Sequence, residues 1–388
     1  MTSTDAKPLT APIKALPAPW YTSQAMFELE KRAIFSKRWL FTTHTSRVPK
    51  PGNWVLYQIT DYNYVVAHER TGIKAYVCID NGEATLNGAT EGLEVSQIDV
   101  LFGFDFQAHL GKFRSAHVHV DRQAFVWVNL DQSEKPEFSW ENDFEAIDRQ
   151  PRHAAWYKPQ SYVYDHTWVI EAHYNWKLAA DNWNECYHCK TTHPDIPDMM
   201  DISSHSVEPN RAWMLHNSPP PASPEVAEEN KKKGIGFFSS YCWPNVSITI
   251  AKNLIYNQRF IPVSPSKTIV TYEVFRVDGE SVEDFNHHHV LIKRVMEEDK
   301  ALCVAAQNNI ERGVFVNGDL HPRLEIGSLY FQQLTREAVI EHVEIEDKVA
   351  HEIWPAGRAT HNFKMVSGAA SRDRLAAPST QALPQVTS

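Results

Sequence analysis

Short segments in which polar and apolar residues alternate occupy two stretches of the chain, and they restrict its fold more than any other sequence feature. Alternation with a period of two is typical of antiparallel strands with one buried face. In the first stretch the strand candidates are residues 54–58, 63–67, 73–77, 117–120 and 125–129. In the second they are residues 161–172, 247–253, 255–262 and 268–277. The pattern therefore predicts two regions of antiparallel sheet.

One long helix is predicted over residues 282–312, because apolar side chains recur there at helical spacing. Long antiparallel strands that bracket such a helix are typical of an α+β domain in which a curved sheet grips the helix. We predict an α+β protein with a small β domain over residues 20–155 and a larger domain over residues 156–366. The remaining residues, 1–19 and 367–388, are predicted to form a disordered lead and tail.

The overall charge and composition exclude several classes of protein. The 388 residues include 38 Lys and Arg against 48 Asp and Glu, a formal net charge of −10. This balance argues against nucleic-acid or anionic membrane partners, which require concentrated positive charge. No run of about 18 apolar residues is present, so no transmembrane helix is predicted. Five scattered cysteines do not make a disulfide framework, which favours a reducing, cytoplasmic location.

The densest group of chemically active residues lies between Asn175 and His193. The helix predicted from Asn175 places four polar side chains on one face: Lys177, Asp181, Glu185 and His188. His188 and His193 are five residues apart, so an ideal helix would point them about 140° apart. They can share a metal ion only if the helix unwinds between them, and Pro194 favours such a break. The alternative is a solvated polar face with two incidental histidines.

Asp299, on the long helix, is the third candidate ligand. It lies within the apolar stripe of that helix, whereas Glu297, Glu298 and Lys300 are predicted to face elsewhere. A carboxylate on a core-facing stripe is costly unless a partner neutralises it, and a metal ion does so. Two histidines and one carboxylate form the facial triad that suits non-haem Fe(II) and oxygen activation, although zinc hydrolases use similar ligands. An internal ion pair is the alternative role for Asp299.

The run N-W-K-x-x-x-D-N-x-x-E-x-Y-H-x-x-x-x-H, which begins at Asn175, resembles the iron-binding signature of Rieske-type aromatic-ring-hydroxylating oxygenase α subunits. The similarity is nearest the choline monooxygenase branch, and it extends to residues 20–21, 30–35, 125–130, 298–299 and 321–325. The resemblance implies that His188, His193 and Asp299 bind mononuclear Fe(II). It also implies that Glu185 carries electrons from a Rieske centre to the iron.

The resemblance further implies a helix-grip (START/Bet v1-like) catalytic domain with a curved antiparallel sheet, preceded by a Rieske-like β domain. The common assembly of the family is a trimer, in which the Rieske centre of one subunit serves the iron of its neighbour. The small β domain of this chain is therefore expected to be a degenerate and truncated version of the Rieske domain.

The sequence departs from the family where the [2Fe–2S] cluster should be bound. A Rieske cluster needs the pattern C-x-H followed downstream by C-x-x-H. Cys78 stands where the first cysteine belongs, but Asp80 occupies the histidine position. No other cysteine precedes Cys186, and no histidine lies between His68 and His109. We predict that the ligands of the cluster are missing from this chain.

Three functions remain open at this stage. The first is a choline monooxygenase-like iron enzyme that uses O₂ to hydroxylate a small substrate, with electrons from a reductase or an intact homologous subunit in a homo- or hetero-trimer. On this hypothesis the missing segment is either genuine or the result of a lost exon. The second is a catalytically inactive helix-grip relative or partner subunit that binds a metal or ligand. The third is a zinc-dependent hydrolase with Glu185 as the base.

Three aromatic residues on the predicted gripping sheet are candidates for the substrate pocket: Trp243, Tyr241 and Tyr256. An aromatic cage would attract a quaternary amine through cation–π interactions. The alternative is that these side chains are ordinary core residues, because aromatic residues inside sheets usually are.

Overall fold

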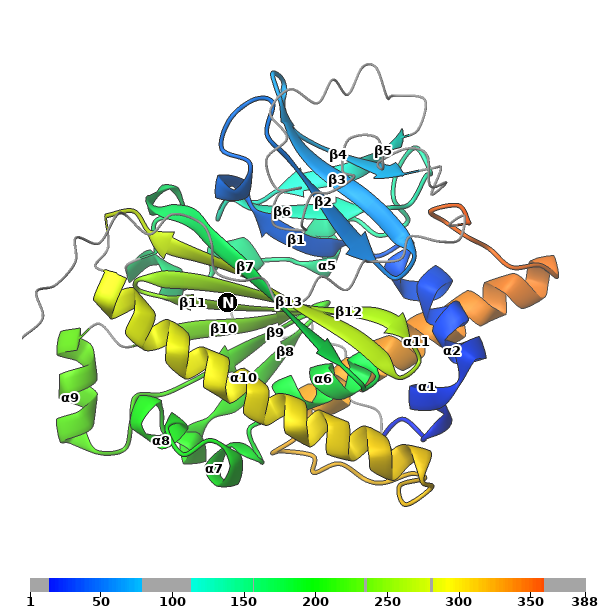
Figure 1. Ribbon diagram of the computed structural model, residues 1–388. Helices are drawn as coiled ribbons and strands as arrows, with labels where there is room; N and C mark the ends of the chain where they lie inside the picture. The colour runs from blue at the N-terminus through cyan, green and yellow to red at the C-terminus, as the bar shows by residue number, and fades with distance from the viewer. Residues whose placement is uncertain (1–13, 79–112, 156, 234–235, 280–281, 359–388) are drawn as a thin grey trace, which may run out of the picture.

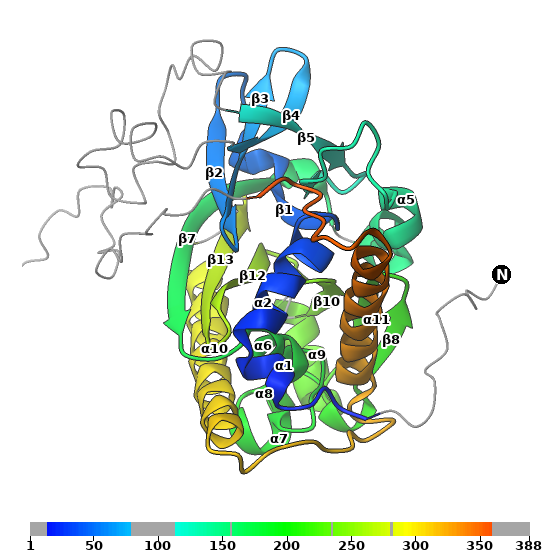
Figure 2. The same cartoon turned by 90° about the vertical axis from the view of Figure 1, so that its right-hand side faces the viewer.

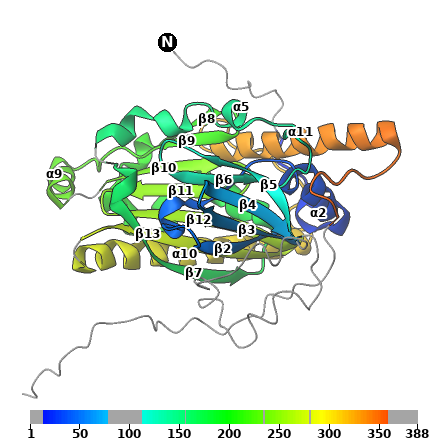
Figure 3. The same cartoon turned by 90° about the horizontal axis from the view of Figure 1, so that it is seen from above.

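The computed structural model describes residues 14–78, 113–155, 157–233, 236–279 and 282–358, and two antiparallel sheets organise them (Figure 1). The smaller sheet has the strand order β1-β6-β5-β4-β3-β2. Its strands are β1 (Leu40–His44), β2 (Trp54–Ile59), β3 (Tyr62–Glu69), β4 (Gly72–Cys78), β5 (Phe113–Val120) and β6 (Phe125–Asn129). The smaller sheet lies over strands of the larger one when the molecule is seen from above (Figure 3).

The larger sheet has the strand order β7-β13-β12-β11-β10-β9-β8. Its strands are β7 (Tyr162–Ala172), β8 (Ser206–Asn210), β9 (Trp213–Asn217), β10 (Phe237–Cys242), β11 (Val246–Ala251), β12 (Leu254–Ser264) and β13 (Lys267–Val277). Every neighbouring pair runs antiparallel. The predicted α+β class with a curved antiparallel sheet is confirmed, although β8, β9 and β10 were not predicted.

The α-helices are α1 (Pro19–Thr22), α2 (Gln24–Glu30), α5 (Trp140–Asp143), α6 (Trp176–Trp183), α7 (Cys189–Thr192), α8 (Ile196–Met199), α9 (Pro224–Lys233), α10 (Val282–Glu311) and α11 (Ile326–Val349). Helix α6 packs on β12, and α10 and α11 both pack against α6 (Figure 2). Helix α10 matches the long helix predicted from the sequence, whereas α11 was not predicted. Within the described residues, no helix combines the length and the apolar character needed to span a membrane.

The predicted disordered lead is wrong for residues 14–19. Leu16 is fully buried, and its backbone N–H donates to Gln332 Oε1 at 2.8 Å. The backbone N–H of Ala15 donates to the carbonyl of Gly318 at 3.0 Å. Contacts with segments about 300 residues later in the chain hold these residues, and a local sequence pattern does not reveal such partners. Residues 1–13 and the predicted tail, 367–388, lie outside the described residues.

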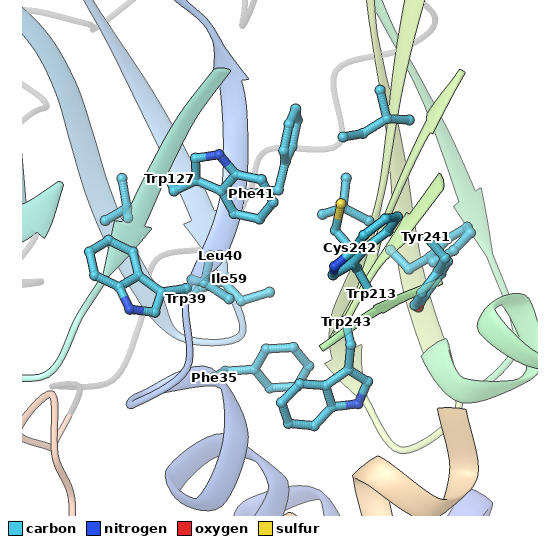
Figure 4. Close-up of a cluster of buried hydrophobic side chains, with 14 of the residues drawn as sticks. Phe35, Trp39, Leu40, Phe41, Ile59, Trp127, Trp213, Tyr241, Cys242 and Trp243 are labelled. Atoms are coloured by element: carbon cyan, nitrogen blue, oxygen red, sulfur yellow. The ribbon is translucent and has the colours of Figure 1, made fainter. Parts of the chain in front are cut away.

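One hydrophobic core joins the two sheets. Figure 4 shows Phe41 and Trp127 on the side of the small sheet and Trp213 and Cys242 on the side of the large sheet. Beside this core, the buried carboxylate of Glu273 accepts hydrogen bonds from Thr43 Oγ1 at 2.7 Å and from Tyr57 Oη at 2.9 Å. Because both donors belong to the small β domain, these bonds fix that domain on the outer face of β13.

Lys177 and Asp181, which were predicted to lie on a polar face of the helix, make contacts inside the protein and are not simply solvated. Lys177 Nζ donates to Glu30 Oε1 at 2.6 Å, and neither side chain is more than 1% exposed. Glu30 Oε2 also accepts a hydrogen bond from Trp176 Nε1 at 2.9 Å. One turn later, Asp181 accepts hydrogen bonds from Tyr21 Oη at 2.7 Å and from Gln332 Nε2 at 2.8 Å. These contacts anchor α6 to α1, α2 and α11.

We predict that Lys177→Met lowers the free energy of unfolding by roughly 3–5 kcal/mol, because it leaves the Glu30 carboxylate buried without its cation. The double variant Glu30→Leu/Lys177→Met should recover most of that loss, since both buried charges are removed. Urea denaturation measures both values. Lys135→Met, at an exposed position, is the matched control and should change stability by less than about 0.5 kcal/mol. A Lys177→Met protein as stable as the control would contradict the prediction.

A second prediction concerns pH. Burial raises the pKa of Asp181 to about 7, although hydrogen bonds from Gln332 and Tyr21 partly oppose the shift. An unfolded aspartate titrates near 3.9, so this group stabilises the folded state fully below about pH 4, and that contribution is lost as the pH rises through 7. The difference in the free energy of unfolding between Asp181→Asn and the wild type should therefore shift in favour of the variant when the pH is raised from 5 to 8. Urea denaturation at both pH values tests this, and a difference that is independent of pH would contradict it.

Candidate metal centre

The three ligands predicted from the sequence meet at one point. Asp299 Oδ1 lies 3.2 Å from His188 Nε2 and 3.1 Å from His193 Nε2. Ligand atoms about 2.1 Å from a shared ion, at angles of 90–110°, are about 3.0–3.4 Å apart. The separation of Asp299 from each histidine is therefore compatible with ligation of one first-row divalent ion. That an ion binds here remains a prediction.

Two breaks in the helical path bring the histidines together. Helix α6 ends at Trp183, whereas the sequence predicted a helix that includes His188. The Asn184 side chain caps α6 by donating to the carbonyl of Ala180 at 2.8 Å. His188 then directly precedes the four-residue helix α7, and His193 directly follows it. The helical path is thus interrupted twice, once between α6 and α7 and once at the end of α7, before Pro194. Each histidine lies at an end of α7, where both rings can turn toward α10.

A carboxylate orients each histidine from behind. The Nδ1 atom of His188 is hydrogen-bonded to Glu185 Oε1, and the Nδ1 atom of His193 lies 2.8 Å from Glu298 Oε2. With both Nδ1 atoms engaged, the Nε2 atoms are directed at Asp299, the arrangement that metal-binding histidines usually have. The prediction that Glu298 faces elsewhere is wrong. Its position next to Asp299 in the sequence was the only available signal.

The charges around this point favour a bound cation. Burial by itself lowers the pKa of His188, but hydrogen bonds to Asp299 and Glu185 outweigh it and raise this pKa to about 9. The pKa of His193 is also raised, because contacts with Asp299 and Glu298 outweigh burial. Asn182 Nδ2 donates to Asp299 Oδ1 at 2.8 Å and holds that carboxylate in place. The carboxylates of Glu185, Glu298 and Asp299 around the two imidazoles give this region a negative electrostatic potential.

A disulfide joins Cys186 and Cys189 beside the centre, which the sequence analysis did not predict. One ligand atom each from His188, Cys189 and His193 lie within 4.8 Å of one another. Because the sulfur of Cys189 is bonded to that of Cys186, it offers no thiolate to a metal ion. Asp299 is therefore the third ligand that this arrangement supports.

A cavity of about 180 Å³ opens beside the three ligands. Helices α8 and α10 give it an apolar wall that includes Ile196, Met199, Leu291, Ile292, Val295 and Met296. The inner face of the large sheet contributes polar side chains, including Ser239, Ser247, Thr249, Tyr256, Gln258 and Tyr272, together with the apolar Phe237, Ala251 and Leu254. The cavity is large enough for a small organic molecule whose one end lies at the metal centre.

Of the three aromatic residues predicted for the substrate pocket, Tyr256 lies in the lining of this cavity, whereas Tyr241 and Trp243 do not. Tyr241 is fully buried, and its hydroxyl donates to the carbonyl of Pro244 at 2.7 Å. Trp243 Nε1 donates to Thr335 Oγ1 on α11 at 3.1 Å. Both are core residues, which corrects the prediction for these two positions.

Comparisons with known proteins agree on one family. Residues 159–341 match the model of the ring-hydroxylating α subunit (catalytic domain). The chain is 23% identical over 303 residues to the carnitine monooxygenase oxygenase subunit of Acinetobacter pittii, covering 69% of this chain and 77% of that protein. It is 30% identical over 203 residues to the glycine betaine monooxygenase oxygenase subunit of Chromohalobacter salexigens, covering 47% of this chain and 44% of that protein.

Solved structures have the same fold. A quaternary ammonium Rieske monooxygenase that oxidises carnitine in gut microbiota superposes with a TM-score of 0.66 at 19% identity, over 84% of this chain and 95% of that one. Naphthalene 1,2-dioxygenase from Rhodococcus superposes with a TM-score of 0.58 at 14% identity, over 85% of this chain and 96% of that one. At these identities the likeness concerns the fold alone.

We predict that Glu298→Ala weakens divalent metal binding about 10- to 100-fold, although it removes no ligand, because the His193 ring loses the partner that orients it. Titration with Co(II), followed by its visible absorption, measures the affinity. Glu297→Ala is the matched control, since Glu297 is the exposed neighbour on the same helix. Equal affinities for the two variants would show that Glu298 does not position His193.

Proposed function

The chain belongs to the Rieske-type ring-hydroxylating oxygenase α-subunit family, whose members are non-haem iron oxygenases, and we propose that it hydroxylates a small quaternary ammonium substrate. The observation that carries the proposal is the convergence of His188, His193 and Asp299 beside a cavity of small-molecule size. These three residues would hold Fe(II), which would supply O₂ activation. The overall reaction is R–H + O₂ + 2 e⁻ + 2 H⁺ → R–OH + H₂O.

The protein residues around the centre have separate tasks in this proposal. Glu185 and Glu298 hold the two imidazoles in the orientation that directs Nε2 to the metal. The apolar side chains of α8 and α10 exclude water from the cavity, which protects the reacting carbon from side reactions. We further assign Glu185 as the residue through which electrons enter, because it lies in the segment between α6 and α7 and contacts His188 directly.

Two features support a quaternary ammonium substrate. The lining contains the aromatic rings of Trp183, Phe237 and Tyr256, which can attract an alkylammonium group by cation–π interactions. The Tyr256 hydroxyl lies 2.5 Å from His289 Nδ1, so its ring is fixed between β12 and α10. The similar proteins from Acinetobacter and Chromohalobacter are oxygenase subunits for carnitine and glycine betaine.

The family implies a Rieske [2Fe–2S] cluster in addition to the mononuclear iron, and the residues of this chain do not fit one. The cluster requires two cysteines and two histidines, whereas Cys78, at the end of β4, is the only cysteine before Cys186 in the sequence. Residues 79–112, where the other ligands would be expected, lie outside the described residues. We therefore propose that electrons come from a reductase or from an intact homologous subunit of a trimer.

Metal analysis and isotope labelling test the proposal together. The purified protein should bind one iron per chain, and Asp299→Ala should abolish binding, while Glu297→Ala should not. Given choline or glycine betaine, a reductant and an electron-transfer partner, the iron-loaded protein should incorporate ¹⁸O from ¹⁸O₂ into the product.

Other outcomes separate the alternatives. Zinc at the same ligands, with hydrolysis and no O₂ uptake, would favour the zinc hydrolase. Stoichiometric iron without O₂ uptake, even with an intact homologous subunit present, would favour the inactive relative. Either result would overturn the proposed function.

A further inference from the structure

Three polar side chains form a hydrogen-bonded row across the sheet wall of the cavity. Ser247 on β11, Gln258 on β12 and Tyr272 on β13 are direct cross-strand partners. Ser247 Oγ lies 2.9 Å from Gln258 Oε1, and Gln258 Nε2 lies 3.0 Å from Tyr272 Oη. All three side chains line the cavity, and none is more than 8% exposed. We call this row the polar ladder.

The polar ladder has more hydrogen-bond donors than it uses. The two hydroxyl groups and the amide carry four hydrogens in total, and the two bonds within the ladder consume two of them. This count is the same if the oxygen and nitrogen of the Gln258 amide are exchanged. Two donors therefore remain for a group in the cavity. Buried donors without acceptors are strongly unfavourable, so their presence on a cavity wall points to a ligand that accepts from them.

The electrostatic surroundings keep the polar ladder neutral. Burial raises the pKa of the Tyr272 hydroxyl above its ordinary value, and Tyr174 and Asp299 raise it further, so the hydroxyl remains a donor. The carboxylates in the described lining, Glu185 and Asp299, belong to the metal centre. A ligand oxygen at the ladder is therefore recognised by uncharged donors, which suit a hydroxyl or carbonyl oxygen.

We infer that Ser247, Gln258 and Tyr272 determine substrate specificity by binding an uncharged oxygen of the substrate. This contact would hold the substrate across the cavity, with its other end at the metal centre. The inference rests on the proposed function, in that it takes the occupant of the cavity to be the substrate. It goes beyond that function by naming the residues that discriminate between substrates of similar size.

Calorimetric titration without O₂ can test this inference with two cations that differ in one group. Choline carries a hydroxyl, and ethyltrimethylammonium is the same cation without it. We expect the wild type to bind choline about 10-fold more tightly. Gln258→Leu and Tyr272→Phe should each weaken choline binding roughly 2- to 12-fold, while ethyltrimethylammonium binding stays within about 2-fold. A third probe, 3,3-dimethylbutan-1-ol, has the hydroxyl without the charge. Each of the two substitutions should weaken its binding by the same factor as the binding of choline.

Thr271→Val is the matched control, because Thr271 adjoins Tyr272 in sequence but is hydrogen-bonded to Arg259 on the other face of the sheet. It should leave the preference for choline unchanged. Equal binding of the two cations by the wild type would overturn the inference, as would failure of both hydroxyl-bearing probes to bind at millimolar concentration. Because the titration needs no turnover, an inactive protein that still prefers choline would count against the proposed function and for the polar ladder.

Discussion

The carboxylate of Asp299 is the interaction on which the rest of the site depends. A partly buried negative charge beside the apolar stripe of a helix is unfavourable by itself, and here two imidazoles and an amide surround it. The contact draws α10 toward the segment between α6 and α8. Leu291, Val295 and Met296 of the same helix line the cavity together with Asp299. The metal centre and the apolar wall of the cavity therefore share one helix.

This arrangement requires a rigid base, and buried polar contacts at α6 provide one. Lys177 and Asp181 lie on the side of α6 that faces the N-terminal helices and α11, where Glu30 and Tyr21 engage them. Because buried hydrogen bonds are directional, they fix the rotation of α6 about its axis more strongly than apolar packing alone would. The rotation in turn decides where the chain leaves α6 at Trp183. The positions of Glu185 and His188 follow from that exit point.

Local patterns were sufficient for part of this description. The apolar spacing of residues 291–310 predicted α10 and singled out Asp299, and the spacing of His188 and His193 required a break that the structure contains. Helix α11 was missed because its buried face includes polar residues such as Gln332 and Thr335, which weaken the apolar signal. Glu298 was missed because its partner, His193, is 105 residues away in the sequence. The sequence thus indicated the candidate ligands, whereas the groups that orient them depend on tertiary contacts.

The cavity has an apolar helix wall and a sheet wall that also carries polar groups, and this has a consequence for what can occupy it. The helix wall offers only dispersion and exclusion of water, so it accepts any apolar group of suitable size. The sheet wall offers hydrogen bonds at fixed positions, because its donors are held by the register of β11, β12 and β13. An apolar wall discriminates weakly between molecules that differ by one methylene, whereas buried polar groups discriminate strongly against a ligand that leaves them unpaired. On the proposed function, discrimination between substrates would therefore come from the sheet wall, and reactivity from the metal centre formed by the two histidines that flank α7 and by Asp299 of α10.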